Sequence, residues 1–191
     1  MKTRKELYEY IEQDAKANGR TKSKADFFGD MCWKFQVTLR KFEYYTSCGR
    51  QKSLLFPFYV YYRLRLQHLS VKLGFTIPAH RIGKGFSIAH RGTIVVSTAS
   101  TIGENCRIHE GVTIGATNGS LNAPQIGSNV FIATGAKIIG DITIADDVCI
   151  AANAVVTKSI TEPGTTWGGI PAKKISDKSS RANLSDLLFE K

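Results

Sequence analysis

The C-terminal half of the chain repeats aliphatic residues at every sixth position. Between residues 102 and 156 this grid has ten positions, and nine of them hold Ile or Val: Ile102, Ile108, Ile114, Ile126, Ile132, Ile138, Ile144, Ile150 and Val156. Ser120 occupies the tenth position. A period of six fits neither an α-helix, with about 3.6 residues per turn, nor a β-meander with a turn every 8 to 12 residues or so. It indicates short parallel strands joined by tight corners, with the aliphatic side chains stacked inside a coil.

A second run of aliphatic residues precedes this grid with the same period. Ile82, Ile88 and Ile94 are offset from the grid by two residues. The offset predicts a small insertion between Val95 and Thr101. With three strands to a coil of about 18 residues, the fold class is mainly β, a parallel β-helix of hexapeptide repeats.

Residues 1–73 have a different composition and no six-residue period. They contain 14 of the 19 aromatic residues and carry a net charge of +8 out of the total of +10. Helix-forming residues between turn signals predict helices over 3–17, 24–46 and 54–72. We therefore expect a helical N-terminal segment over 1–73, a β-helix domain over 74–176 and a C-terminal tail over 177–191.

The third predicted helix mixes aliphatic and basic side chains. Leu64 and Leu66 alternate with Arg63 and Arg65. Such a surface could make a peripheral contact with an anionic membrane or with a lipid-linked substrate. Alternatively its apolar side packs on the β-helix or on an oligomer axis. A nucleic-acid partner is not expected, because acidic residues dilute the basic ones and no nucleic-acid-binding motif is present.

The termini and cysteines point to a cytoplasmic protein. The first ten residues are charged and lack the apolar stretch of a signal peptide. The longest apolar run, residues 54–62, is about half of what a bilayer requires. The four cysteines show neither a CxxC pair nor metal-ligand spacing. We expect a cytoplasmic location, with a peripheral position at the inner face of the membrane as an alternative.

Four segments carry a family resemblance. They are residues 82–90 (IGKGFSIAH), 111–117 (GVTIGAT), 124–156 and 168–175 (GGIPAKKI). In order and spacing they resemble the hexapeptide-repeat acyltransferases, and among these the serine acetyltransferases. The resemblance implies a left-handed β-helix, a homotrimer, and acetyl-CoA as co-substrate in the groove between neighbouring subunits. It implies no metal.

The resemblance also assigns catalytic and acceptor-binding residues. His90 matches the histidine that serves the family as general base, a role that suits the near-neutral pKa of imidazole. We expect His109 and Asn122 to contact the acceptor. His68 and His80 are expected to be structural or exposed to solvent.

The coenzyme site is expected on main-chain groups and two lysines. The residues matching the pantetheine arm or lying one coil further along are Gly115, Ala116, Thr134, Gly135, Ala152 and Asn153. Lys173 and Lys174 are expected to meet the nucleotide phosphates as point charges.

Departures from the serine enzymes concern the acceptor. Ala89 stands where the family has Asp before its catalytic histidine, and residues 75–78 (Phe-Thr-Ile-Pro) stand where it has Asp-Ile-His-Pro. Asn122 and Ala123 replace an Arg-His pair before Pro124. Because unpaired charges are costly to bury, a site without these groups is unsuited to a free amino acid.

Three functions therefore compete. The preferred hypothesis is an O-acetyltransferase for a sugar hydroxyl of a surface-polysaccharide precursor, similar to capsule and exopolysaccharide enzymes. The alternative is the serine O-acetyltransferase of cysteine biosynthesis, which would need another carboxylate such as Glu110. A non-enzymatic trimeric scaffold is the third.

Overall fold

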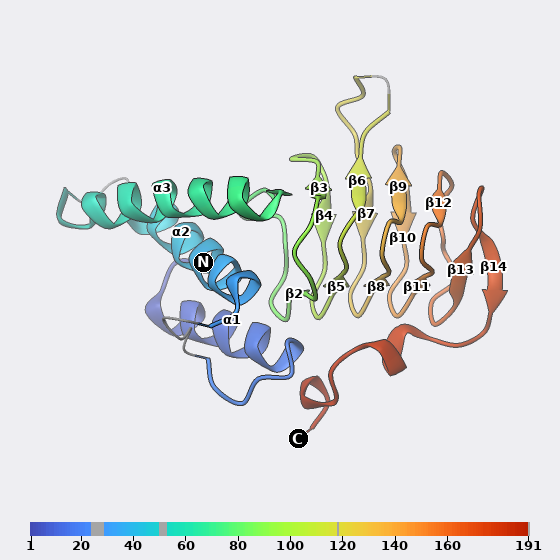
Figure 1. Cartoon of the computed structure of the whole chain (residues 1–191), viewed down its shortest axis with the longest axis horizontal. Helices are drawn as coiled ribbons and strands as arrows, with labels where there is room; N and C mark the ends of the chain where they lie inside the picture. The colour runs from blue at the N-terminus through green and yellow to red at the C-terminus, as the bar shows by residue number, and fades with distance from the viewer. Residues whose placement is uncertain (24–28, 50–52, 118, 191) are drawn as a thin grey trace.

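The chain forms a left-handed parallel β-helix with a helical N-terminal part at one end (Figure 1). This computed structural model describes residues 1–23, 29–49, 53–117 and 119–190. The predicted fold class, mainly β with N-terminal helices, is confirmed.

The N-terminal part consists of α1 (Arg4–Ala17), α2 (Met31–Gly49), the 3-10 turn η1 (Ser53–Leu55) and α3 (Phe56–Leu73). Helix α2 begins later than predicted, because the Asp30 carboxylate accepts the backbone N–H of Cys32 and caps the helix there. Residues 24–28 of the predicted helix lie outside the described residues. Helix α3 ends at Gly74, whose φ of 79° suits glycine.

In the part of the chain that the structure describes, the strands form three sheets. One holds β2 (Ser87–Ile88), β5 (Arg107–Ile108), β8 (Phe131–Ile132), β11 (Cys149–Ile150), β13 (Thr166–Gly168) and β14 (Lys173–Ser176). A second holds β1 (Phe75–Thr76), β3 (Ile94–Val96), β6 (Thr113–Gly115), β9 (Lys137–Ile139) and β12 (Val155–Val156). The third holds β4 (Thr101–Ile102), β7 (Gln125–Ile126) and β10 (Thr143–Ile144).

The grid residues form the interior of the coil. Ile108, Ile132 and Ile150 stack in register across the first sheet, and each is 0% exposed. Ser120, the position that interrupts the grid, lies in the loop between β6 and β7, which projects from the coil in Figure 1. The ladder resumes at Ile126 because the loop leaves and re-enters the coil at one corner.

The predicted insertion lies elsewhere than expected. Ile88 pairs with Ile108, and Val96 pairs with Ile114, so eight residues in the first coil match six in the second. The two extra residues therefore lie in the turn between β2 and β3, and not between Val95 and Thr101. The hydrophobic pattern could not locate the two extra residues, because Ile94 and Val96 are both buried and either one could continue the ladder.

A buried guanidinium joins the helices to the first coil. Arg40 donates through Nε to Asp14 at 2.7 Å and through Nη1 to Glu43 at 3.1 Å. It also donates to the main-chain carbonyls of Ile82 and Gly83 at 2.9 and 2.5 Å. Burial lowers the pKa of Arg40, but the two carboxylates outweigh it and hold that pKa above its usual value. Arg40 therefore keeps its positive charge inside the protein. We call Arg40, Asp14 and Glu43 the Arg40 cluster.

The C-terminal tail runs back along the coils toward α1 (Figure 1). Leu184, in the tail, packs on Phe131 and Cys149, which lie on the outer face of the first sheet. Among the described residues, no helix is both long and apolar enough to cross a bilayer.

Replacing Arg40 with Met tests the Arg40 cluster. The substitution leaves two buried carboxylates without a countercharge, so we expect the free energy of unfolding to fall by about 3–5 kcal/mol. Chemical denaturation measures this change. Lys5→Met removes a 4.0 Å surface contact to Glu9 and should cost less than about 0.5 kcal/mol. Equal denaturation midpoints for the two variants would show that Arg40 does not hold the helices on the coil.

Candidate active site

Two histidines and a glutamate meet at one corner of the coil. His90 lies two residues beyond Ile88 of β2, and Glu110 lies two residues beyond Ile108 of β5. Because Ile88 and Ile108 are paired, the two corners stack. The potential ligand atoms of His90, His109 and Glu110 all lie within 4.8 Å of one another.

The His109 ring is held between two other rings. Its centroid lies 5.6 Å from that of His90 and 5.0 Å from that of Phe131, both in edge-on geometry. Its Nδ1 atom lies 3.5 Å from Thr134 Oγ1, and its buried Nε2 has no hydrogen-bond partner within the described residues. Burial, followed by the charge of Arg107, lowers the pKa of His109, which favours the neutral form of this ring.

The Glu110 carboxylate is anchored on one oxygen. Thr134 Oγ1 donates to Oε1 at 3.0 Å, whereas Oε2 is buried with no partner in the described parts of the chain. The backbone N–H of Glu110 itself, the Thr134 hydroxyl and the two imidazoles hold the pKa of Glu110 below its usual value. Glu110 is therefore a fixed negative charge.

An exposed imidazole beside a fixed carboxylate can carry out proton transfer. His90 is exposed at this corner, so a hydroxyl group in solution can reach it. A carboxylate nearby stabilises the imidazolium that forms when the ring accepts a proton. Two imidazoles and a carboxylate are also donors that zinc accepts. The arrangement suits a general base.

Four of the predicted coenzyme residues extend the same corner. Thr134 and Gly135 follow β8, and Ala152 and Asn153 follow β11, so they stack above Glu110 along the coil axis. The backbone N–H of Asn153 donates to the Thr134 carbonyl at 2.9 Å, which fixes this spacing. These residues form a continuous strip that starts at His90.

The remaining predicted residues lie away from His90 in a single chain. Gly115 is the last residue of β6, and Ala116 directly after it starts the projecting loop, whereas the corner with Glu110 precedes that strand. In that loop, Asn122 donates to Asp141 at 2.8 Å.

The two lysines lie at the far end of the coil. They belong to β14, and β2 is at the other end of the same sheet, about 24 Å away at the usual strand spacing. Lys174 pairs with Asp177 at 2.5 Å and Glu162 at 2.6 Å, hydrogen bonds that raise its pKa. Both lysines are exposed. Only Lys173 presents its ammonium group to solvent without these two carboxylates.

Two residues at the corner were missed by sequence reasoning. Phe131 supports the His109 ring, and Arg107 lowers the His109 pKa. Phe131 and Arg107 each come directly before a grid isoleucine. Their side chains therefore point outward, on the same face as the residue directly after that isoleucine. That alternation was the available signal.

Comparisons with known proteins show what the chain as a whole is similar to. Residues 123–158 match the family model of the bacterial transferase hexapeptide (six repeats). A serine acetyltransferase of Staphylococcus epidermidis is 39% identical over 122 residues, which cover 59% of this chain and 57% of the relative. The chain thus spans a little over half the length of this curated relative.

Solved structures extend the similarity to nearly the whole chain. Serine acetyltransferase of Brucella abortus in complex with coenzyme A has a TM-score of 0.70 and 28% identity, and covers 92% of this chain and 70% of its own. The Neisseria gonorrhoeae enzyme in complex with serine has a TM-score of 0.69 and 27% identity, with 91% and 70% coverage. The chain is therefore similar to the bacterial hexapeptide transferases over residues 123–158, and to serine acetyltransferases over most of its length.

Proposed function

We propose that this chain is an acetyl-CoA-dependent O-acetyltransferase, with residues 74–176 as the catalytic domain and His90 as the general base. The observation that carries the proposal is the exposed His90 imidazole, which stands beside a fixed carboxylate at the start of a strip of main-chain groups. The serine acetyltransferase solved with coenzyme A supports the choice of coenzyme.

His90 would accept the proton of the acceptor hydroxyl as its oxygen attacks the thioester carbonyl. A backbone N–H would stabilise the oxyanion, and Gly115, which lies away from His90 within one chain, would supply it only from a second copy. The imidazolium would return the proton to the departing thiolate. Cys106 and Cys32 are unsuited to an acyl-enzyme route, because burial raises the pKa of Cys106 to about 12 and that of Cys32 to about 11. Direct transfer is therefore preferred.

Serine is the acceptor that the relatives favour. The similar proteins are named serine acetyltransferases, and one was solved with serine bound. This favours the alternative over the sugar acceptor preferred from sequence. The loss of the family's aspartates weighed against serine, but Glu110 supplies a carboxylate at the same corner.

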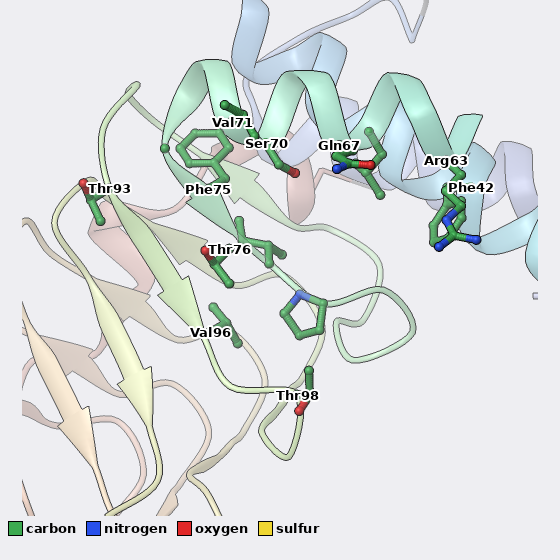
Figure 2. A pocket seen from close by; sticks show the side chains of 14 residues that line it. Phe42, Arg63, Gln67, Ser70, Val71, Phe75, Thr76, Thr93, Val96 and Thr98 are labelled. Atoms are coloured by element: carbon green, nitrogen blue, oxygen red, sulfur yellow. The ribbon is translucent and has the colours of Figure 1, made fainter. Parts of the chain in front are cut away.

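A sugar acceptor remains the second candidate because of a cavity beside the first coil. This cavity, of about 620 Å³, lies between α3 and the strands β1 and β3 (Figure 2). Hydroxyl side chains line it at Thr76, Thr93 and Thr98, with Gln67 and Arg63 on the helix. Thr93 lies in the turn that also carries His90, and the space exceeds what free serine requires.

A coupled assay of thiol release discriminates between the two acceptors. With acetyl-CoA present, we expect serine to give a kcat/KM at least tenfold above that of lipid-linked or nucleotide sugars. The reverse order would restore the sugar acceptor. Absence of turnover with every acceptor, together with no binding of acetyl-CoA by calorimetry, would leave the scaffold hypothesis.

Replacing His90 with Ala tests the proposed base. We expect kcat to fall by roughly 10²- to 10⁴-fold while the affinity for coenzyme A changes little, because a general base acts in the chemical step. Steady-state kinetics and calorimetry measure the two effects. His68→Ala, an exposed histidine on α3, is the matched control and should keep wild-type activity. If the His90 variant keeps more than about a third of the activity, the base is another group, with His109 next.

We also propose that the active unit is a homotrimer. His90 stands exposed on a convex corner, so a second copy of the chain is needed to enclose the coenzyme. Light scattering should then give three times the chain mass of 21.0 kDa. A stable monomer would contradict this.

Contact of residues 54–72 with an anionic membrane stays a prediction. Its support is that Phe56, Phe58 and Leu64 of α3 are half or more exposed, next to Arg63 and Arg65. Failure to sediment with phosphatidylserine vesicles would exclude it.

A further inference from the structure

We propose that Glu110 is the positioning residue for His90: its carboxylate, seated under the turn that carries the histidine, orients the imidazole and balances its charge. The inference rests on the proposed function, since it assigns His90 as the base.

The backbone of the His90 turn lies directly against Glu110. Gly92 has a φ of 141°, and a Cβ atom at this position would lie 2.9 Å from the Cβ of Glu110. The turn has two residues more than the corner of the next coil, so it is long enough to pass over the carboxylate. A side chain at position 92 would displace Glu110, which explains the glycine.

Glu110 is held in a way that leaves one oxygen available. Thr134 fixes Oε1 at 3.0 Å, and Oε2 is buried with no donor among the described residues. A buried acceptor without a donor costs free energy, which a hydrogen bond from a nearby N–H group would recover. Both imidazoles lie within 4.8 Å of the carboxylate, and His90, being exposed, is free to turn toward it. The ring nitrogen of His90 that donates to Glu110 leaves the second ring nitrogen to accept the proton of the acceptor hydroxyl.

The surrounding charges make a carboxylate necessary at this corner. Arg107 lies close enough to lower the pKa of His109, and the Lys137 ammonium donates to the Gly111 carbonyl. Protonated His90 would add a third positive charge beside the neutral His109. Ala89 and Phe75 offer no side-chain polar atom to compensate it. In the described part of the chain, Glu110 is the carboxylate that lies within 4.8 Å of both imidazoles.

Glu110→Gln in the full-length protein tests the proposal. The amide keeps the size and an oxygen for Thr134 but removes the charge. We expect kcat to fall by roughly 10²-fold with the KM for acetyl-CoA within about twofold of wild type. The acid limb of the pH–rate profile should move to lower pH, because the imidazolium loses its countercharge. Glu110→Asp should recover part of the activity.

Glu104→Gln is the matched control. This exposed carboxylate belongs to the same coil and lies 4.0 Å from Lys84, away from the corner. It should leave kcat and the pH profile unchanged. If Glu110→Gln lowers kcat but leaves the pH profile in place and Glu110→Asp restores nothing, Glu110 is merely structural and the proposal fails.

A second readout does not depend on acetyl transfer. The ¹⁵N shifts of the ring nitrogens should show one predominant His90 tautomer in the wild type and a mixture in Glu110→Gln. The pKa of His109 should fall further in that variant, because the Glu110 carboxylate raises it. Unchanged ring shifts would overturn the proposal even in an active enzyme. If the ring shifts change in Glu110→Gln as expected but the wild type transfers no acetyl group, only the proposed function is refuted.

Discussion

A single buried arginine determines how the two parts of the molecule meet. The Arg40 guanidinium links α1 to α2 through Asp14 and Glu43, and links both helices to the first coil through the carbonyls of Ile82 and Gly83. Its carboxylate partners bind the coil as well, because Asp14 accepts the N–H of Phe86 and Glu43 accepts that of His80. These charged groups, whose hydrogen bonds are satisfied, close this end of the β-helix together with apolar residues of α2 such as Phe35 and Leu39, which join the core of the coil. The His90 corner belongs to this same coil.

Much of the fold could be predicted because the coil is repetitive. Grid residues inside the coil pair with the coil before and the coil after, as Ile108 does with Ile88 and Ile132, so periodicity alone revealed the ladder from Ile102 to Val156. The start of α2 depended on a cap at Asp30, and the two-residue insertion depended on which of two buried residues continues the ladder. The cap is a local side-chain hydrogen bond, whereas the insertion is decided by tertiary pairing, and the hydrophobic pattern contains neither.

The residues of the candidate site likewise fall into those that the repeat predicts and those that it does not. His90, Thr134, Gly135, Ala152 and Asn153 come together because each follows a strand of the same sheet, and the repeat fixes that order. Asn122 and Lys174 interact instead with Asp141, Glu162 and Asp177, which no periodicity indicates. The importance of Glu110 likewise depends on the turn above it, since only the backbone of Gly92 shows how closely the two coils approach.

The longer turn between β2 and β3 has a consequence for how such a chain can change. The ladder continues in register on both sides of it, from Ile88 to Ile108 and from Val96 to Ile114. Residues can therefore be added or lost at this corner without shifting a single interior side chain. The coil thus separates the residues that keep the protein folded from those of the proposed acceptor site. The proposed site can then change at a corner while the stability of the coil stays the same.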